Sequence, residues 1–143
     1  MKIDLETLRG FFASSPFMVD LGIVPTAVGE GRVCTVLPIA PRHLQHTGVV
    51  HAGVMAAMAD HSMGAAAQTM APEGFWILTA ELKTSLLRSG KGERLVCEAC
   101  VIKPGRMLTF TEAEVFAEAA DGKRTLVMKA SATMALTPAA GRG

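Results

Sequence analysis

The sequence lacks the features that mark several classes of protein. Its 143 residues carry 14 Lys and Arg against 13 Asp and Glu, and no run of like charge exceeds two residues. This balance excludes the basic surface of a nucleic-acid-binding protein and the polybasic segment of a membrane anchor. No stretch approaches the roughly 20 consecutive apolar residues of a membrane span, and residues 1–6 mix both charge signs with apolar side chains, unlike a signal peptide. We therefore expect a cytoplasmic protein that binds neither nucleic acid nor membranes.

Cysteine is also scarce, with three in the chain. Cys34 stands alone, whereas Cys97 and Cys100 lie in the apolar segment 94–102, whose composition is typical of a β-strand. Side chains three positions apart on a strand point to opposite faces, so this C-x-x-C pair cannot converge on a metal ion. We expect ordinary core thiols and no disulfide framework.

Internal repeats and low-complexity segments are absent as well, and 50% of the residues are hydrophobic. A chain of this length and composition forms one domain, here residues 1–138, followed by a short tail at 139–143. Apolar spacing predicts an amphipathic helix over 3–12. Alternating residues then predict strands over 17–23, 32–37, 76–86, 93–103, 106–118 and 123–136. The short connections between the last four strands allow only antiparallel neighbours.

The segment Ala52–Met70 has a different composition. It is rich in Ala and Met and has no β-branched run, which favours a helix, and the near absence of a polar face predicts that this helix is buried. Its many Gly and Ala residues allow strands to approach its axis closely. The predicted fold is therefore α+β, a curved antiparallel sheet wrapped around one long buried helix.

Asp60 lies midway along this predicted helix. A carboxylate in apolar surroundings costs several kcal/mol unless it is paired or hydrogen-bonded. One interpretation is a structural acid satisfied by His61, Ser62 or a hydroxyl of a neighbouring strand. The other is a general base or nucleophile whose pKa is set by burial. The residues alone leave both interpretations open.

The loop that leads into the helix, Leu44–Gly53, is polar. It contains Gln45 and His51 and ends where free backbone N–H groups and the positive end of the helix dipole can bind a carbonyl oxygen that becomes negative. A simpler interpretation is that His51 only caps the helix and Gln45 only solvates the loop. Together with a buried acid, these residues indicate an oxyanion site.

Spacing disfavours a metal site and predicts a dimer. None of the four histidines has another histidine one turn away on a helical face, and His61 is rotated by about 100° from Asp60. Gly53 and Asp60 are separated by about 10 Å along the helix axis, so one carbonyl cannot contact both. If both serve one reaction, the simplest arrangement is two antiparallel helices related by a two-fold axis. A catalytic interpretation thus predicts active sites shared between two chains.

The same residues resemble the motif of the hotdog-fold acyl-CoA thioesterases, specifically the PaaI-like branch. That family has a Gln or Asn, then G-x-x-H-G-G, then an Asp or Glu on the central helix. The similarity continues through 79–83, 87–88, 105–106 and 121–123 and so covers nearly the whole chain. The motif residues here are Gln45, Gly48, His51, Ala52, Gly53 and Asp60.

The resemblance implies a hotdog fold and the hydrolysis of CoA esters of aromatic or medium-chain acids. It implies a homodimer, commonly paired into a tetramer as a dimer of dimers, with no cofactor and no metal. Asp60 would be the base that activates water or the nucleophile that attacks the carbonyl. The backbone N–H of Ala52, together with that of Gly53, would polarise the thioester oxygen.

The resemblance also assigns roles to other polar residues. Gln45 and His51 would orient the carbonyl and the water or thiolate, and Thr79 would hold Asp60 or its water. Arg88 and Arg106 are candidates for contacts with the CoA phosphates. For each arginine, a solvated surface charge is the alternative interpretation.

The chain departs from the family pattern at three positions. Ala52 replaces the first Gly of the pair, which is harmful only if the backbone there requires a positive φ. Gly64 stands where some relatives carry a Ser or Thr, so Thr79 is expected to supply the hydroxyl that supports the acid. Met107 stands where a Ser or Thr is often found, which weakens a phosphate contact nearby.

Two other functions of hotdog domains stay open at this point. One is a non-catalytic module that binds acyl-CoA. The other is a dehydratase or hydratase, in which His51 and Asp60 would act on one carbon atom of the acyl chain.

Overall fold

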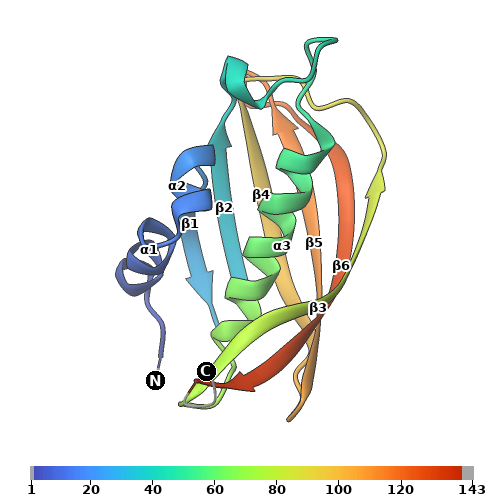
Figure 1. The fold of residues 1–143 in the computed structure, drawn as a ribbon. Coiled ribbons are helices and arrows are strands. Elements are labelled where there is room, and N and C mark those ends of the chain that lie inside the picture. The colour runs from blue at the N-terminus through green and yellow to red at the C-terminus, as the bar shows by residue number, and fades with distance from the viewer. Residues whose placement is uncertain (1, 140–143) are drawn as a thin grey trace.

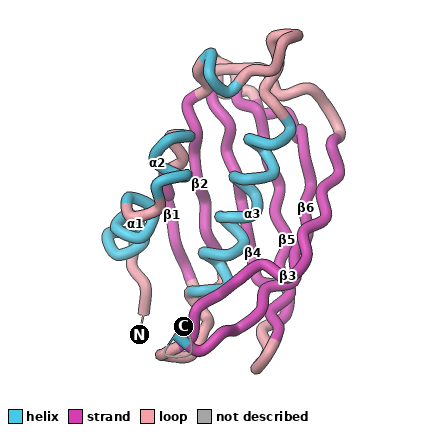
Figure 2. The backbone as a smooth tube through the Cα atoms, in the orientation of Figure 1, coloured by secondary structure: helices cyan, strands magenta, loops and turns pink. Residues whose placement is uncertain are grey.

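The computed structural model describes residues 2–139 as a six-stranded antiparallel sheet that curves around one long helix. Figures 1 and 2 show this helix, α3, on the inner face of the sheet, with α1 and α2 beside β1 at one edge. The strand order is β1-β2-β4-β5-β6-β3, and no described helix has the length and apolar character needed to cross a membrane. The elements are α1 (Leu5–Ala13), α2 (Pro16–Leu21), β1 (Val24–Gly29), β2 (Arg32–Pro38), a 3₁₀ turn (Pro41–His43), α3 (Ala52–Gln68), β3 (Phe75–Leu86), β4 (Arg94–Lys103), β5 (Leu108–Glu118) and β6 (Arg124–Pro138).

The predicted strand over 17–23 is wrong. Most of this segment is helical, as the greater part of α2, and β1 begins only at Val24. Pro16 stands at the first helical position, where its fixed φ favours a helix. Gly22 ends the helix with a φ of 86°, in the left-handed region. Six helical residues are too few for the apolar pattern to separate a helix from a strand.

The other predicted elements are present, with ends that differ by at most two residues. β4, β5 and β6 form a meander, as predicted. β3 is not a neighbour of β4, contrary to the prediction from their short connection, and pairs with β6 at the edge of the sheet. On β4, Cys97 points into the core, where burial raises the pKa of its thiol to about 12. Cys100 is on the opposite face, as expected for a strand. Of the predicted tail, residues 140–143 lie outside the described residues.

A β-bulge interrupts β3. Thr79 pairs with Met134 and Glu81 pairs with Thr133, which leaves Ala80 without a partner. Paired residues share a face of the sheet, so Thr79 faces the helix with the buried Met134, whereas Glu81 faces outward. Thr79 and Glu81 therefore lie on opposite faces, although regular alternation would place residues two positions apart on the same face. A bulge re-aims a side chain in this way.

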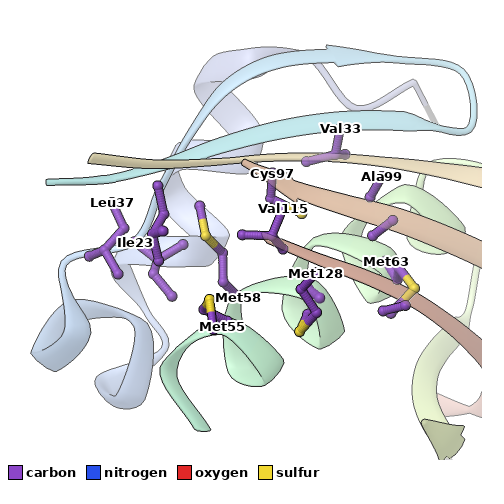
Figure 3. Packing of buried hydrophobic residues seen from close by; sticks show 14 of the residues in the cluster. Ile23, Val33, Leu37, Met55, Met58, Met63, Cys97, Ala99, Val115 and Met128 are labelled. Atoms are coloured by element: carbon purple, nitrogen blue, oxygen red, sulfur yellow. The ribbon is translucent and has the colours of Figure 1, made fainter. Parts of the chain in front are cut away.

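The core lies between α3 and the inner face of the sheet. Figure 3 shows Met55, Met58 and Met63 of α3 packed with Val115 and Met128. The opposite face of α3 is only partly covered in a single chain, so the helix is fully buried on the side of the sheet and half-buried on the other. The small or polar residues of this open face are exposed or half-buried: Gly53, Ala56, Ala57, Asp60 and Gly64.

Candidate active site

Asp60 lies in a cavity formed by α1, α3 and β3. The cavity has a volume of about 380 Å³, and apolar side chains form most of its wall. The Thr79 hydroxyl donates a hydrogen bond to Asp60 Oδ1 at 2.6 Å, and residues 2–139 supply no other side-chain donor to this carboxylate. Asp60 is half-buried, so a ligand in the cavity can reach it. The main apolar lining residues are Leu8, Phe11, Phe12, Trp76, Ile77 and Leu78.

His51 caps the N-terminal end of α3. Its Nδ1 accepts a hydrogen bond from the Gly53 N–H at 2.8 Å, so in the neutral ring Nε2 carries the proton and is a donor. This bond occupies the Gly53 N–H, which is therefore not available as an oxyanion donor, contrary to expectation. The Ala52 N–H has no acceptor among residues 2–139 and remains available.

The two positions of the Gly pair have different requirements. A Cβ atom at Gly53 would lie 3.0 Å from His51 Nδ1, so a side chain there would disturb the cap. Within residues 2–139 every positive φ belongs to a glycine, so Ala52 has an ordinary backbone conformation. The replacement of the first Gly by Ala52 thus leaves the local structure intact.

Gln45 stands at the base of a tight turn. The Gln45 N–H donates to Val49 O at 2.8 Å, and the Gly48 N–H donates to Gln45 O at 2.9 Å. The side-chain Oε1 accepts two hydrogen bonds from Thr47, one from its N–H at 2.9 Å and one from its hydroxyl at 2.6 Å. The Gln45 amide NH₂ has no acceptor among residues 2–139 and is therefore an available donor.

The structure places these residues in two groups. Asp60 and Thr79 line the cavity, whereas Gln45, His51 and Ala52 lie at the start of α3. Because α3 is one continuous helix, the start of the helix and Asp60 are separated by about 10 Å along the axis. One thioester carbonyl cannot contact both groups of a single chain.

The two candidate phosphate contacts are also far apart. The exposed Arg88 donates to Leu126 O at 3.1 Å, near the start of β6, whereas Met107, the neighbour of Arg106, accepts the Leu136 N–H near the end of β6. These two points are ten positions apart along β6, which corresponds to about 33 Å. In one chain, the two arginines cannot contact the same diphosphate.

His43 is a structural residue. It is buried, its Nδ1 accepts the Ala40 N–H at 2.9 Å, and its Nε2 donates to Leu21 O at 2.6 Å. Both ring nitrogens are occupied, so His43 cannot bind a metal. The described part of the chain contains no group of three or more His, Cys, Asp or Glu side chains arranged to hold a metal ion.

Sequence reasoning missed two residues beside the candidate groups. His61 lines the same cavity as Asp60 despite the rotation between them, because α1 folds over this face and places Phe12 at 4.6 Å from the His61 ring, edge to face. Burial lowers the pKa of His61. No sequence pattern indicated this contact. Thr47 is the second missed residue, and its spacing was a usable signal. It follows Gln45 by two residues, the spacing at which a polar side chain can bond to the backbone of a turn.

The curved sheet around one long helix, with an acid in an apolar cavity beside that helix, defines a hotdog-fold protein. The chain matches the thioesterase superfamily over residues 47–121. It is similar to the crystal structure of a thioesterase family protein from Silicibacter pomeroyi, with 33% identity, a TM-score of 0.88 and coverage of 92% of this chain and 96% of that one.

Two further structures have the same fold. A thioesterase from Haemophilus influenzae has 23% identity and a TM-score of 0.85, with coverage of 97% of this chain and 94% of that chain. The PaaI protein of Escherichia coli, from a phenylacetic acid degradation operon, has 17% identity and a TM-score of 0.77, with coverage of 90% and 88%. The chain belongs to the thioesterase superfamily and is a thioester hydrolase.

Proposed function

We propose that the protein hydrolyses acyl-CoA thioesters of aromatic or medium-chain acids. The observation that carries this proposal is the Asp60 carboxylate, held by Thr79 in a cavity with mostly apolar walls. The volume of about 380 Å³ is more than twice the ~150 Å³ that holds benzene, and it lies near the lower end of the ~300–1,000 Å³ range of small-molecule sites. A single aromatic ring or a medium chain suits such a space.

The available donors and the acid suit acyl transfer to water. Thr79 occupies Asp60 Oδ1, which leaves Oδ2 to face water or the carbonyl carbon. As a base, Asp60 accepts a proton from the water whose oxygen attacks this carbon; as a nucleophile, it attacks directly, and water then cleaves the anhydride. The C–S bond breaks, and the thiolate leaves and takes up a proton. The Ala52 N–H, the Gln45 amide and His51 Nε2–H stabilise the developing negative charge.

The acid and the donors act together in our proposal because two chains form a homodimer with shared sites. β3 supports this assembly: it is a long edge strand, and Leu78, Leu82 and Leu86 on it are exposed by 44%, 39% and 55%. A long apolar edge strand is prone to pair with another chain.

Antiparallel pairing of two β3 strands across a two-fold axis places the two α3 helices antiparallel on one face of a continuous sheet. The start of one helix then faces the middle of the other, where Asp60 lies. The same two-fold axis brings opposite ends of the two sheets together. Arg88 of one chain and Arg106 of the other can then contact one CoA.

The substitution Asp60→Asn tests the role of the acid, because it preserves shape and removes the charge. We expect kcat to fall at least about a hundredfold on a panel of acyl-CoAs, measured by the release of free thiol. Asp20→Asn, at an exposed position of α2, is the matched control and should keep normal turnover. Near-normal thiol release by folded Asp60→Asn protein would refute the proposal.

The same panel separates the alternative functions. A change in enoyl absorbance without thiol release would indicate a dehydratase or hydratase. Saturable binding of acyl-CoA without either signal would indicate a binding module.

A further inference from the structure

The loop before α3 contains an arrangement that the family resemblance does not assign. Both hydrogen bonds to Gln45 Oε1 come from one residue, Thr47, through its backbone N–H at 2.9 Å and its hydroxyl at 2.6 Å. Thr47 itself is exposed and packs against no part of the core. Its hydroxyl therefore has no evident role in holding the fold together.

The two bonds determine which way the Gln45 amide faces. A backbone N–H is always a donor, so the atom that it contacts must be the amide oxygen. Rotation of the amide by about 180° would place the NH₂ group against the Thr47 N–H and leave that N–H without an acceptor. The oxygen is thus held toward Thr47, and the NH₂ group is directed away from it.

The turn makes this geometry rigid. The hydrogen bonds from Gln45 N–H to Val49 O and from Gly48 N–H to Gln45 O close a short loop, and Gly48 has the positive φ of 87° that a G1-bulge hairpin requires. Leu44 and Val50 form a bridge just outside the loop. The backbone of Thr47 is therefore fixed relative to Gln45, so its N–H selects one amide orientation and its hydroxyl adds a second bond that holds the amide there.

We propose that Thr47 is a positioning residue for hydrolysis, which holds the Gln45 amide so that its NH₂ group donates to the thioester oxygen. The inverted amide would present an oxygen to the developing negative charge and would oppose the reaction. This inference rests on the proposed function, since it assumes that Gln45 acts in hydrolysis. Thr47 touches neither substrate nor reacting atoms and acts through Gln45.

The substitution Thr47→Val removes the hydroxyl bond and preserves the shape and the N–H bond. One lost neutral hydrogen bond corresponds to a decrease in kcat of about two- to tenfold, with KM nearly unchanged because the bond orients a group that acts in the transition state. Thr47→Ser keeps a hydroxyl and should restore most of the activity. His46→Ala, at the exposed neighbouring position of the same loop, is the control for the loop and should remain at the wild-type level.

A double-mutant cycle separates positioning from a general effect on structure. In a Gln45→Ala background, Thr47→Val should have no further effect on kcat, because no amide remains to be held. An equal decrease in both backgrounds would overturn the inference, as would a normal kcat for Thr47→Val in the wild-type background.

Gln45→Glu tests the direction of donation. This change keeps an oxygen for both Thr47 bonds but replaces the outward NH₂ group by a carboxylate oxygen, so kcat should fall at least as far as in Gln45→Ala. If both Gln45 variants keep normal kcat, the proposed role of Gln45 fails, whatever Thr47 does. If they lower kcat and Thr47→Val does not, only the inference about Thr47 fails.

Discussion

Mixing two inactive variants tests whether each active site is shared between chains. In the structure, the start of α3 and Asp60 are separated by about 10 Å along one continuous helix, so the two groups of one chain cannot act on one carbonyl. Asp60→Asn removes the cavity group, and Gln45→Ala removes a donor at the helix start. A heterodimer of the two then has one site with both defects and one intact site.

The expected recovery follows from counting sites. Unfolding and refolding an equal mixture gives about half heterodimers by random exchange across a two-fold interface, and each heterodimer has one intact site of two. Recovered kcat should therefore approach about a quarter of the wild-type value, if each parent is nearly inactive. Thiol release measures activity, and native mass spectrometry measures the fraction of heterodimers.

A second mixture is the matched control. Gln45→Ala and His51→Ala both damage the helix start, so their heterodimer contains no intact site and should not recover. If the Asp60→Asn and Gln45→Ala mixture contains heterodimers yet stays at the level of its parents, the shared-site proposal is wrong. Asp60 would then have to act with groups of its own chain.

Two further predictions concern titratable groups outside the proposed reaction. Cys97 is buried and its thiol pKa is raised to about 12, so iodoacetamide should modify Cys34 and Cys100 first in the folded protein. Peptide mass spectrometry measures the three rates, and equally fast modification of Cys97 would contradict its burial. Burial lowers the pKa of His61 below its ordinary value of 6.5, so the unfolded chain binds more protons below this pH and stability falls as the pH decreases through that range. Urea unfolding at about pH 5 and pH 7.5 should show a smaller pH dependence for His61→Phe than for wild type, and an unchanged dependence would refute this cause.

The sequence was informative where a local pattern decides the structure. The Ala- and Met-rich composition located α3, and the alternation of apolar residues located β2 and the strands of the C-terminal half. The region of α2 was misread because Pro16 and Gly22, which begin and end a short helix, carry more information there than the alternation does.

Features that depend on contacts between residues far apart in the chain could not be predicted from the sequence. The occupation of the Gly53 N–H depends on the rotamer of His51, and the exposure of one face of α3 depends on where the sheet ends. The hydrogen bond between Thr79 and Asp60 was expected only from the family resemblance. The spacing along the helix did predict that the start of α3 and Asp60 lie far apart, because a continuous helix has a constant rise per residue.

The bulge at Ala80 also determines which side chains of β3 face the helix. Before it, odd-numbered residues such as Thr79 face the helix; after it, even-numbered residues such as Leu82 face the helix, and Lys83 faces outward. If Ala80 instead paired regularly with β6 and the first half kept its pairing, every later side chain of the strand would lie on the other face. Lys83 would then point inward, and Leu82 would point outward. Ala80, which has no partner in the sheet, thus determines which side chains of β3 face the helix and which charged side chains lie on the outer surface.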